Sequence, residues 1–77
     1  MASRHTVADD IVFDLISIQY HALQGAETYS RYLEDAEHSR EHADVTQFIQ
    51  QCRDEDNRRA LRAHELLVEL TRDRGIG

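Results

Sequence analysis

The second half of the chain carries apolar residues at the spacing of one face of an α-helix. The series is Val45, Phe48, Ile49, Cys52, Ala63, Leu66, Leu67 and Leu70. Steps of three and four residues return to the same side of a helix, so the pattern predicts a long amphipathic helix. Asp56 and Arg59 stand where the same spacing calls for apolar side chains. Charged groups in an apolar seam need a partner side chain or a metal ion, and this need constrains the fold and the function together.

A second amphipathic series precedes this one and contains no proline. Its apolar members are Val12, Leu15, Ile16, Leu23, Ala26, Leu33 and Ala36. Residues 6–9 and 44–47 have the pattern of capping boxes at helix starts, and Gly75 is placed to end the second helix. The sequence therefore predicts an all-α protein: an antiparallel two-helix hairpin with helices over about 6–38 and 44–73.

Gly25 interrupts the first predicted helix. A glycine inside a helix costs about 1 kcal/mol relative to alanine. Its neighbours Ala22 and Ala26 are also small, so close approach of the second helix is one explanation. The other explanation is that this glycine is tolerated and has no role in packing.

The apolar arc of the first helix is wider than one neighbouring helix covers. On a helical wheel, Ile18, Ala36, Ile11, Tyr29 and Ala22 lie on one flank, and Val12, Leu23, Ile16, Tyr20 and Phe13 lie on the other. A stripe of about 100° is enough to cover one neighbour, and a hairpin offers only one. The excess predicts burial between chains, in a homodimer that forms an antiparallel four-helix bundle or in a larger ring of such dimers.

Size and composition predict a single small domain over residues 1–77. The one cysteine, Cys52, forms no internal disulfide, so we expect a reducing, cytoplasmic compartment. No stretch approaches the ~20 apolar residues of a membrane span. The net charge of −6 disfavours nucleic acid as a partner. The arginines of 53–62 alternate with acidic residues, which predicts a salt-bridged helix surface.

Antiparallel pairing about a turn near residue 41 brings charged residues to one level of the hairpin. In this register Glu27 faces Glu55 and Asp56, and Leu23 faces Arg59. We call Glu27, Glu55, Asp56 and Arg59 the charged waist. Carboxylates inside a helical bundle must be paired, protonated or bound to metal. The sequence therefore predicts either buried ion pairs or a metal site formed by Glu27, Glu55 and Asp56.

Two stretches carry a resemblance to a known family. Residues 20–29 hold Glu27 among tyrosines and small residues, and residues 48–58 hold Glu55. They resemble the metal-carrying helices of ferritin-like proteins, especially the short two-helix members typified by encapsulated ferritins. The resemblance covers about residues 11–70. It implies a hairpin whose di-iron site is completed between subunits, with ligands from a Glu on the first helix and a Glu-x-x-His on the second.

The chain departs from that pattern at the histidine. Arg58 stands three residues after Glu55, and Arg59 stands three residues after Asp56. A guanidinium stays protonated and binds no cation, but it neutralises a carboxylate with two hydrogen bonds. The favoured hypothesis is a small cytoplasmic, oligomeric structural or interaction protein with ferritin-like architecture, in which ion pairs replace the metal site and no cofactor is bound.

Two alternatives remain open. One is a metal-binding oligomer for iron handling or ferroxidase-type oxidation. Glu27 and Glu55 would then hold iron or manganese at the subunit interface, with Asp56 as a further ligand and Tyr29 as a hydrogen-bond donor to them. The other is a regulatory helix pair that presents its apolar face to a different protein.

Overall fold

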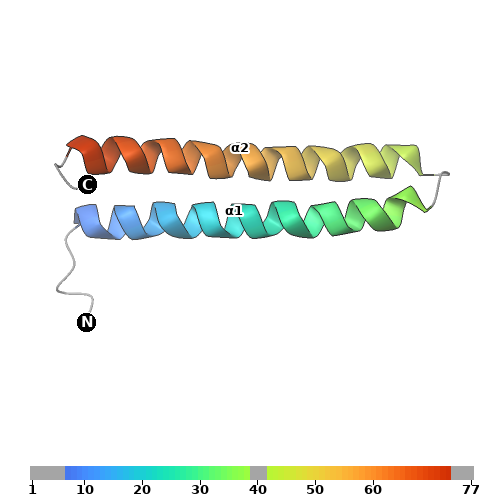
Figure 1. The fold of residues 1–77 in the computed structure, drawn as a ribbon, viewed down its shortest axis with the longest axis horizontal. Coiled ribbons are helices and arrows are strands. Elements are labelled where there is room, and N and C mark those ends of the chain that lie inside the picture. Colours follow the sequence, from blue (N-terminus) through green and yellow to red (C-terminus); the bar gives the residue numbers. More distant parts are fainter. Residues whose placement is uncertain (1–6, 39–41, 74–77) are drawn as a thin grey trace.

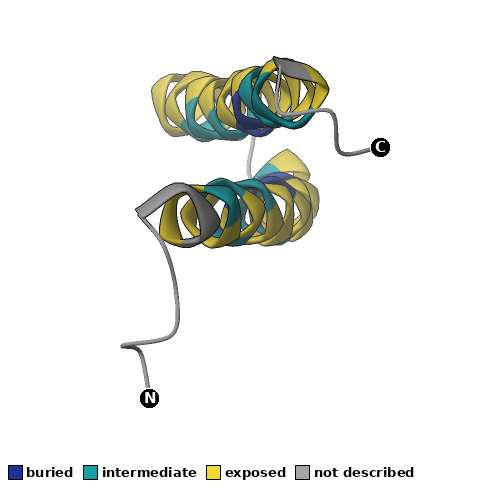
Figure 2. Ribbon diagram, turned by 90° about the vertical axis from the view of Figure 1, so that its left-hand side faces the viewer, coloured by how far each residue is buried: buried dark blue, intermediate teal, exposed yellow. Residues whose placement is uncertain are grey.

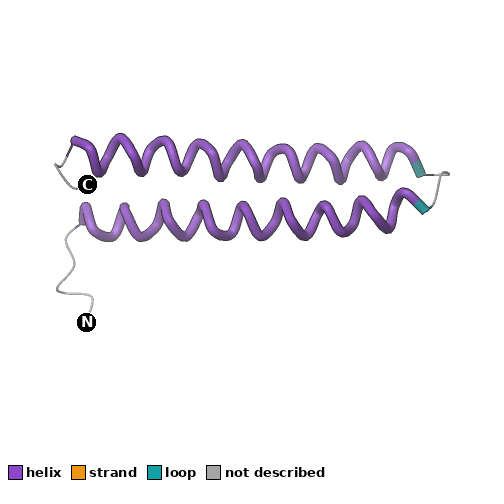
Figure 3. Tube along the Cα trace, viewed as in Figure 1, coloured by secondary structure: helices purple, strands orange, loops and turns teal. Residues whose placement is uncertain are grey.

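Two antiparallel helices of equal length make up the computed structural model. Helix α1 spans Val7–Glu37 and α2 spans Ala43–Asp73, with 31 residues in each (Figure 1). The structure describes residues 7–38 and 42–73. Figure 3 shows that these residues form helices apart from the short ends that flank the turn. The predicted hairpin is confirmed, and each helix boundary lies within one residue of the predicted one.

The start of α2 differs in detail from the predicted capping box. The backbone N–H of Thr46 donates to the carbonyl of His42 at 3.1 Å, which places His42 at the N-cap position. Asp44 lies inside the first turn, where its carboxylate accepts the N–H of Val45 at 3.0 Å. A negative charge there is favourable because the N-terminus of a helix is the positive end of its dipole. The predicted caps at Thr6 and Gly75 lie outside the described residues.

Small residues form the contact between the two helices. The buried apolar side chains among the described residues are Ala22, Ala26, Leu33, Ala60 and Ala63. Figure 2 shows burial confined to the facing sides of the helices. Alanines allow the helices to approach closely, but each buries little apolar area. The hairpin therefore has a thin core.

The larger apolar side chains lie mostly outside this core. Those that are at least 43% exposed are Ile11, Phe13, Ile16, Ile18, Tyr20, Leu23, Tyr32, Val45, Phe48, Leu61 and Val68. They occupy both flanks of the hairpin, as the wide apolar arc of the sequence predicts. Neither helix, within the described residues, has an apolar stretch long enough to cross a membrane.

Candidate functional site

Asp56 lies in the seam between the helices, against α1 at Gly25. A Cβ placed on Gly25 would collide with Oδ2 of Asp56 and would lie 3.3 Å from its Cγ. Glycine is thus the residue that leaves room for the carboxylate as it stands. The close approach that the sequence offers as one explanation of Gly25 is the one that the structure supports, and the approaching group is a charged side chain.

Arg59 pairs with Asp56 from one turn further along α2. A nitrogen of its guanidinium, Nη1, donates to Oδ1 of Asp56. The Asp56 side chain is 17% exposed, whereas that of Arg59 is 55% exposed. The carboxylate is therefore largely enclosed, and the arginine reaches it from the surface. Among the described residues, no buried side-chain nitrogen or oxygen lacks a hydrogen-bond partner.

Tyr29 and Cys52 lie next to this pair. The charge interaction with Cys52, desolvation by burial and the Asp56 carboxylate together raise the pKa of the Tyr29 hydroxyl above its ordinary 10.0. The Tyr29 ring also packs edge-on against Tyr32, with ring centroids 5.9 Å apart. At neutral pH the Tyr29 hydroxyl thus stays protonated and available as a donor. We call Gly25, Tyr29, Cys52, Asp56 and Arg59 the Asp56 cluster.

A shallow groove opens beside the Asp56–Arg59 pair. It is lined by Ser17, Ile18, His21, Ala22, Asp56 and Arg59. A second groove on the same flank continues toward the chain termini and is lined by Ile11, Leu15, Leu66, Glu69 and Leu70. Ile11 and Ile18 are two helical turns apart and share a face of α1. We call this side of the hairpin the charged flank.

The other two members of the charged waist are exposed and lie apart from each other. Glu27 follows Leu23 by one turn, on the flank where Leu23 and Leu61 line a groove. Glu55 precedes Arg59 by one turn, on the charged flank. One hairpin therefore brings Asp56 and Arg59 together but leaves Glu27 and Glu55 on opposite flanks. Within the described residues, no group of three or more His, Cys, Asp or Glu side chains is placed to hold a metal ion.

The remaining arginines of α2 largely follow the prediction of a salt-bridged surface. Arg53 pairs with Asp54 and Arg62 pairs with Glu65, each at 3.2 Å. Both pairs are open to solvent, where an ion pair contributes about 0–1 kcal/mol. Arg58, three residues after Glu55, makes no ion pair with the described part of the chain. The Asp56–Arg59 pair is distinguished by its enclosed carboxylate.

The contact between Tyr29 and Cys52 was not predicted from the sequence. Antiparallel pairing about residue 41 places Ser30 opposite Cys52. The contact could have been predicted from this register, because Tyr29 is next to Ser30. The spacing alone indicated that Cys52 is a small seam residue. It is half-buried and forms no disulfide in the structure.

The chain was compared with protein-family models, with curated proteins and with solved structures, and no match was found. The resemblance to ferritin-like proteins rests on the residues of this chain alone.

Proposed function

We propose that this chain is a structural or interaction protein that assembles with copies of itself. The assembly is a homodimeric four-helix bundle of ferritin-like architecture, in which the Asp56–Arg59 ion pair stands where relatives of that architecture would hold metal. One observation carries the proposal. The core consists of four alanines and one leucine, whereas eleven large apolar side chains remain exposed at the surface.

The surface area of the chain supports the same conclusion. Its accessible surface is 6109 Å². The scaling of compact monomers gives ~4,850 Å² for a chain of 9.0 kDa, about a fifth less. Two helices of this length also rarely persist in water without tertiary burial of their apolar faces. Association removes the excess apolar surface from water without any change of fold.

The enclosed ion pair explains why no metal is needed at this level of the hairpin. Asp56 is oriented by the space above Gly25 and neutralised by Arg59. A carboxylate held in this way is satisfied by the chain itself. The pair thereby fixes the register between α1 and α2 and leaves the outer faces free for partner contacts.

Light scattering or sedimentation at several concentrations tests this proposal. We expect a mass of at least twice 9.0 kDa at micromolar concentration, and a melting temperature that rises with concentration. A folded monomer with a concentration-independent melting temperature would refute self-assembly.

Iron or manganese handling is the second candidate. Glu27 and Glu55 favour it because both are exposed carboxylates without an ion pair among the described residues, at adjacent levels of the hairpin. Since they lie on opposite flanks of one chain, a site with both would take one from each of two chains. Hard divalent cations bind such oxygen ligands.

Anaerobic titration with Fe(II), followed by exposure to air, separates the two candidates. The iron candidate predicts stoichiometric binding and ferric absorbance that disappear in Glu27→Ala and in Glu55→Ala. Glu65→Ala is the matched control, because Glu65 is already paired with Arg62. The absence of stoichiometric binding by the oligomer would reject the iron candidate and leave the structural role.

A further inference from the structure

The flank opposite the Asp56–Arg59 pair carries an apolar surface without formal charge. A groove there is lined by Gln19, Leu23, Asn57, Ala60, Leu61 and His64, so both helices contribute and no Asp, Glu, Lys or Arg is present. Helical spacing adds Ile16 and Tyr20 beside Leu23, Phe13 beside Tyr20, and Val68 two turns after Leu61. We call Phe13, Ile16, Tyr20, Leu23, Leu61 and Val68 the uncharged flank.

These six side chains are strongly exposed. Their exposed fractions are 67% for Phe13, 48% for Ile16, 57% for Tyr20, 50% for Leu23, 57% for Leu61 and 43% for Val68. Tyr20 is held at the rim of this surface by a hydrogen bond from Nε2 of Gln24 to its hydroxyl, at 2.9 Å. An aromatic residue with a fixed polar end is typical of protein interfaces.

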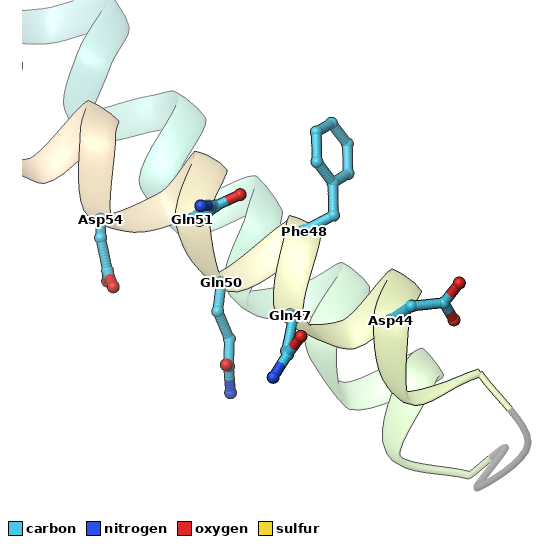
Figure 4. Close-up of a pocket in the computed structure, with 6 residues that line it drawn as sticks. All are labelled: Asp44, Gln47, Phe48, Gln50, Gln51 and Asp54. Atoms are coloured by element: carbon cyan, nitrogen blue, oxygen red, sulfur yellow. The ribbon is translucent and has the colours of Figure 1, made fainter.

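The other described grooves all contain charged side chains. Asp56 and Arg59 line one, and Glu69 lines its continuation. On the outer face of α2, Asp44 and Asp54 line a third, and Figure 4 shows Phe48 pointing to the opposite side from Gln47, Gln50 and Asp54. Two copies of a chain with a net charge of −6 repel each other wherever carboxylates are apposed. None of the six side chains of the uncharged flank is charged, and Glu27 lies at the border of this patch, one turn beyond Leu23. The repulsion is therefore weak where these six side chains meet a second copy.

We propose that the partner on the uncharged flank is a second copy of this chain, docked about a two-fold axis. A two-fold contact sets the same surface against itself, which suits a patch whose six large side chains carry no charge. This inference rests on the proposed self-assembly and specifies which side of the hairpin mediates it.

The size of the patch fits such a contact. Large apolar side chains that are about half exposed offer roughly 100 Å² each, so the six offer about 600 Å² per copy and about 1,200 Å² per dimer. That value reaches the lower limit of specific interfaces before any surrounding residue is counted. The patch lies between the middle of the hairpin and its chain termini, since it spans 13–23 of α1 and 61–68 of α2. The Asp56–Arg59 groove stays outside the contact.

Substitution of Leu61 with a charged residue tests the inference. Leu61→Asp sets two carboxylates against each other across the contact, and we expect the association constant of the full chain to fall at least 100-fold. Phe48→Asp is the matched control, because Phe48 is 63% exposed and stands near the start of α2, on a different side of the helix from Leu61. It should leave the measured mass unchanged. Equal masses for wild type and Leu61→Asp would overturn the inference while self-assembly stands, whereas a monomeric wild type would overturn both.

A mixture of variants identifies a second copy as the partner. Leu61→Asp and Leu61→Arg should each dissociate alone and should form a heterodimer when mixed, because opposite charges then face each other. If either variant is unfolded alone, regained helicity on mixing supports the two-fold contact. A mixture that regains neither mass nor helicity overturns it, as does a wild-type chain that associates only with a different protein.

Discussion

The two flanks of the hairpin differ in whether their side chains are satisfied within one chain. On the charged flank, Arg59 neutralises the Asp56 carboxylate within the chain, and the absence of a side chain at Gly25 leaves room for that carboxylate. On the uncharged flank, Leu23 and Leu61 are not buried by any other part of the chain that the structure describes. A satisfied charge needs no partner molecule, but an exposed apolar patch does. The comparison agrees with the proposal that the charged flank sets the register and that the uncharged flank mediates assembly.

The difference follows from which residues occupy equivalent positions. Each flank receives one row of side chains from α1 and one from α2. The charged flank includes Ile18 and Arg59, and the uncharged flank includes Leu23 and Leu61. Between them, four of the five buried side chains of the seam are alanines, and the fifth is Leu33. Alanines give a close contact with little hydrophobic stabilisation, so in the proposed assembly most of the stabilisation would come from the flanks.

Polar substitutions of matched pairs provide the strongest test of this division. We expect the double variant Leu23→Gln/Leu61→Gln to weaken association by about 3 kcal/mol, because four side chains per dimer lose apolar burial. The double variant Ile11→Gln/Ile18→Gln removes a similar exposed area from the charged flank and should change association by less than about 1 kcal/mol. Sedimentation of both variants over a range of concentrations measures the difference. Equal losses would show that the flanks are equivalent.

Removal of Arg59 tests whether the charged flank is satisfied internally. Arg59→Ala leaves the enclosed Asp56 carboxylate without its counter-ion, and we expect a loss of about 1–2 kcal/mol in the free energy of unfolding. Arg62→Ala breaks a pair of which both members are exposed and should cost at most ~0.5 kcal/mol. Denaturant unfolding at fixed concentration compares the two variants. Identical midpoints would contradict the distinction between the enclosed and the exposed pair.

The sequence was informative about the helices and less so about the site. Apolar periodicity predicted α1 and α2 because that signal is repeated over many turns, and the capping patterns placed the helix ends to within one residue. Antiparallel pairing about residue 41 placed Glu27 opposite Asp56, and the structure places Gly25 there. The register was thus close. A shift of two residues along a helix, however, turns a side chain by about 200°, so the identity of the contacting residue changed.

The fate of Glu27 and Glu55 shows a second limit of sequence reasoning. The position of a residue along the hairpin axis follows from counting residues. The flank on which its side chain lies depends on the rotation of each helix about its own axis. That rotation is set by the alanines at the seam, and an apolar arc as wide as that of α1 does not specify which part faces α2. The sequence therefore placed the four residues of the charged waist at one level without separating the two flanks.

A double-mutant cycle measures how strongly Gly25 and Asp56 depend on each other. In an Asp56→Ala background, Gly25→Ala should stabilise the hairpin by about 1 kcal/mol, the usual gain for alanine over glycine in a helix. With Asp56 present, the new Cβ displaces the carboxylate and the gain should vanish or reverse. We therefore expect a coupling of about 1 kcal/mol from denaturant unfolding of the four proteins. Independent, additive effects would show that the carboxylate does not occupy the space above Gly25.

The smallest expected effect concerns Tyr29, at the edge of the Asp56 cluster. The charge interaction with Cys52, desolvation by burial and the Asp56 carboxylate raise the pKa of its hydroxyl above 10.0 in the folded chain. The unfolded chain then loses this proton at a lower pH than the folded chain, so stability falls as pH rises through 10.0 toward the raised pKa. Below that range both states keep the proton and the contribution does not change with pH.

Tyr29→Phe removes this titrating group and should flatten the loss of stability at alkaline pH. Tyr20→Phe is the control, because Tyr20 lies on the uncharged flank and is 57% exposed. Unfolding of the three proteins between pH 8 and 11, at one concentration, gives the comparison, with the lower limit chosen below the ordinary pKa of tyrosine. If Tyr20→Phe flattened the profile as much as Tyr29→Phe, the negative charges that act on tyrosine would not be confined to the charged flank. That result would contradict the proposed electrostatic difference between the two flanks in the surroundings of Tyr29.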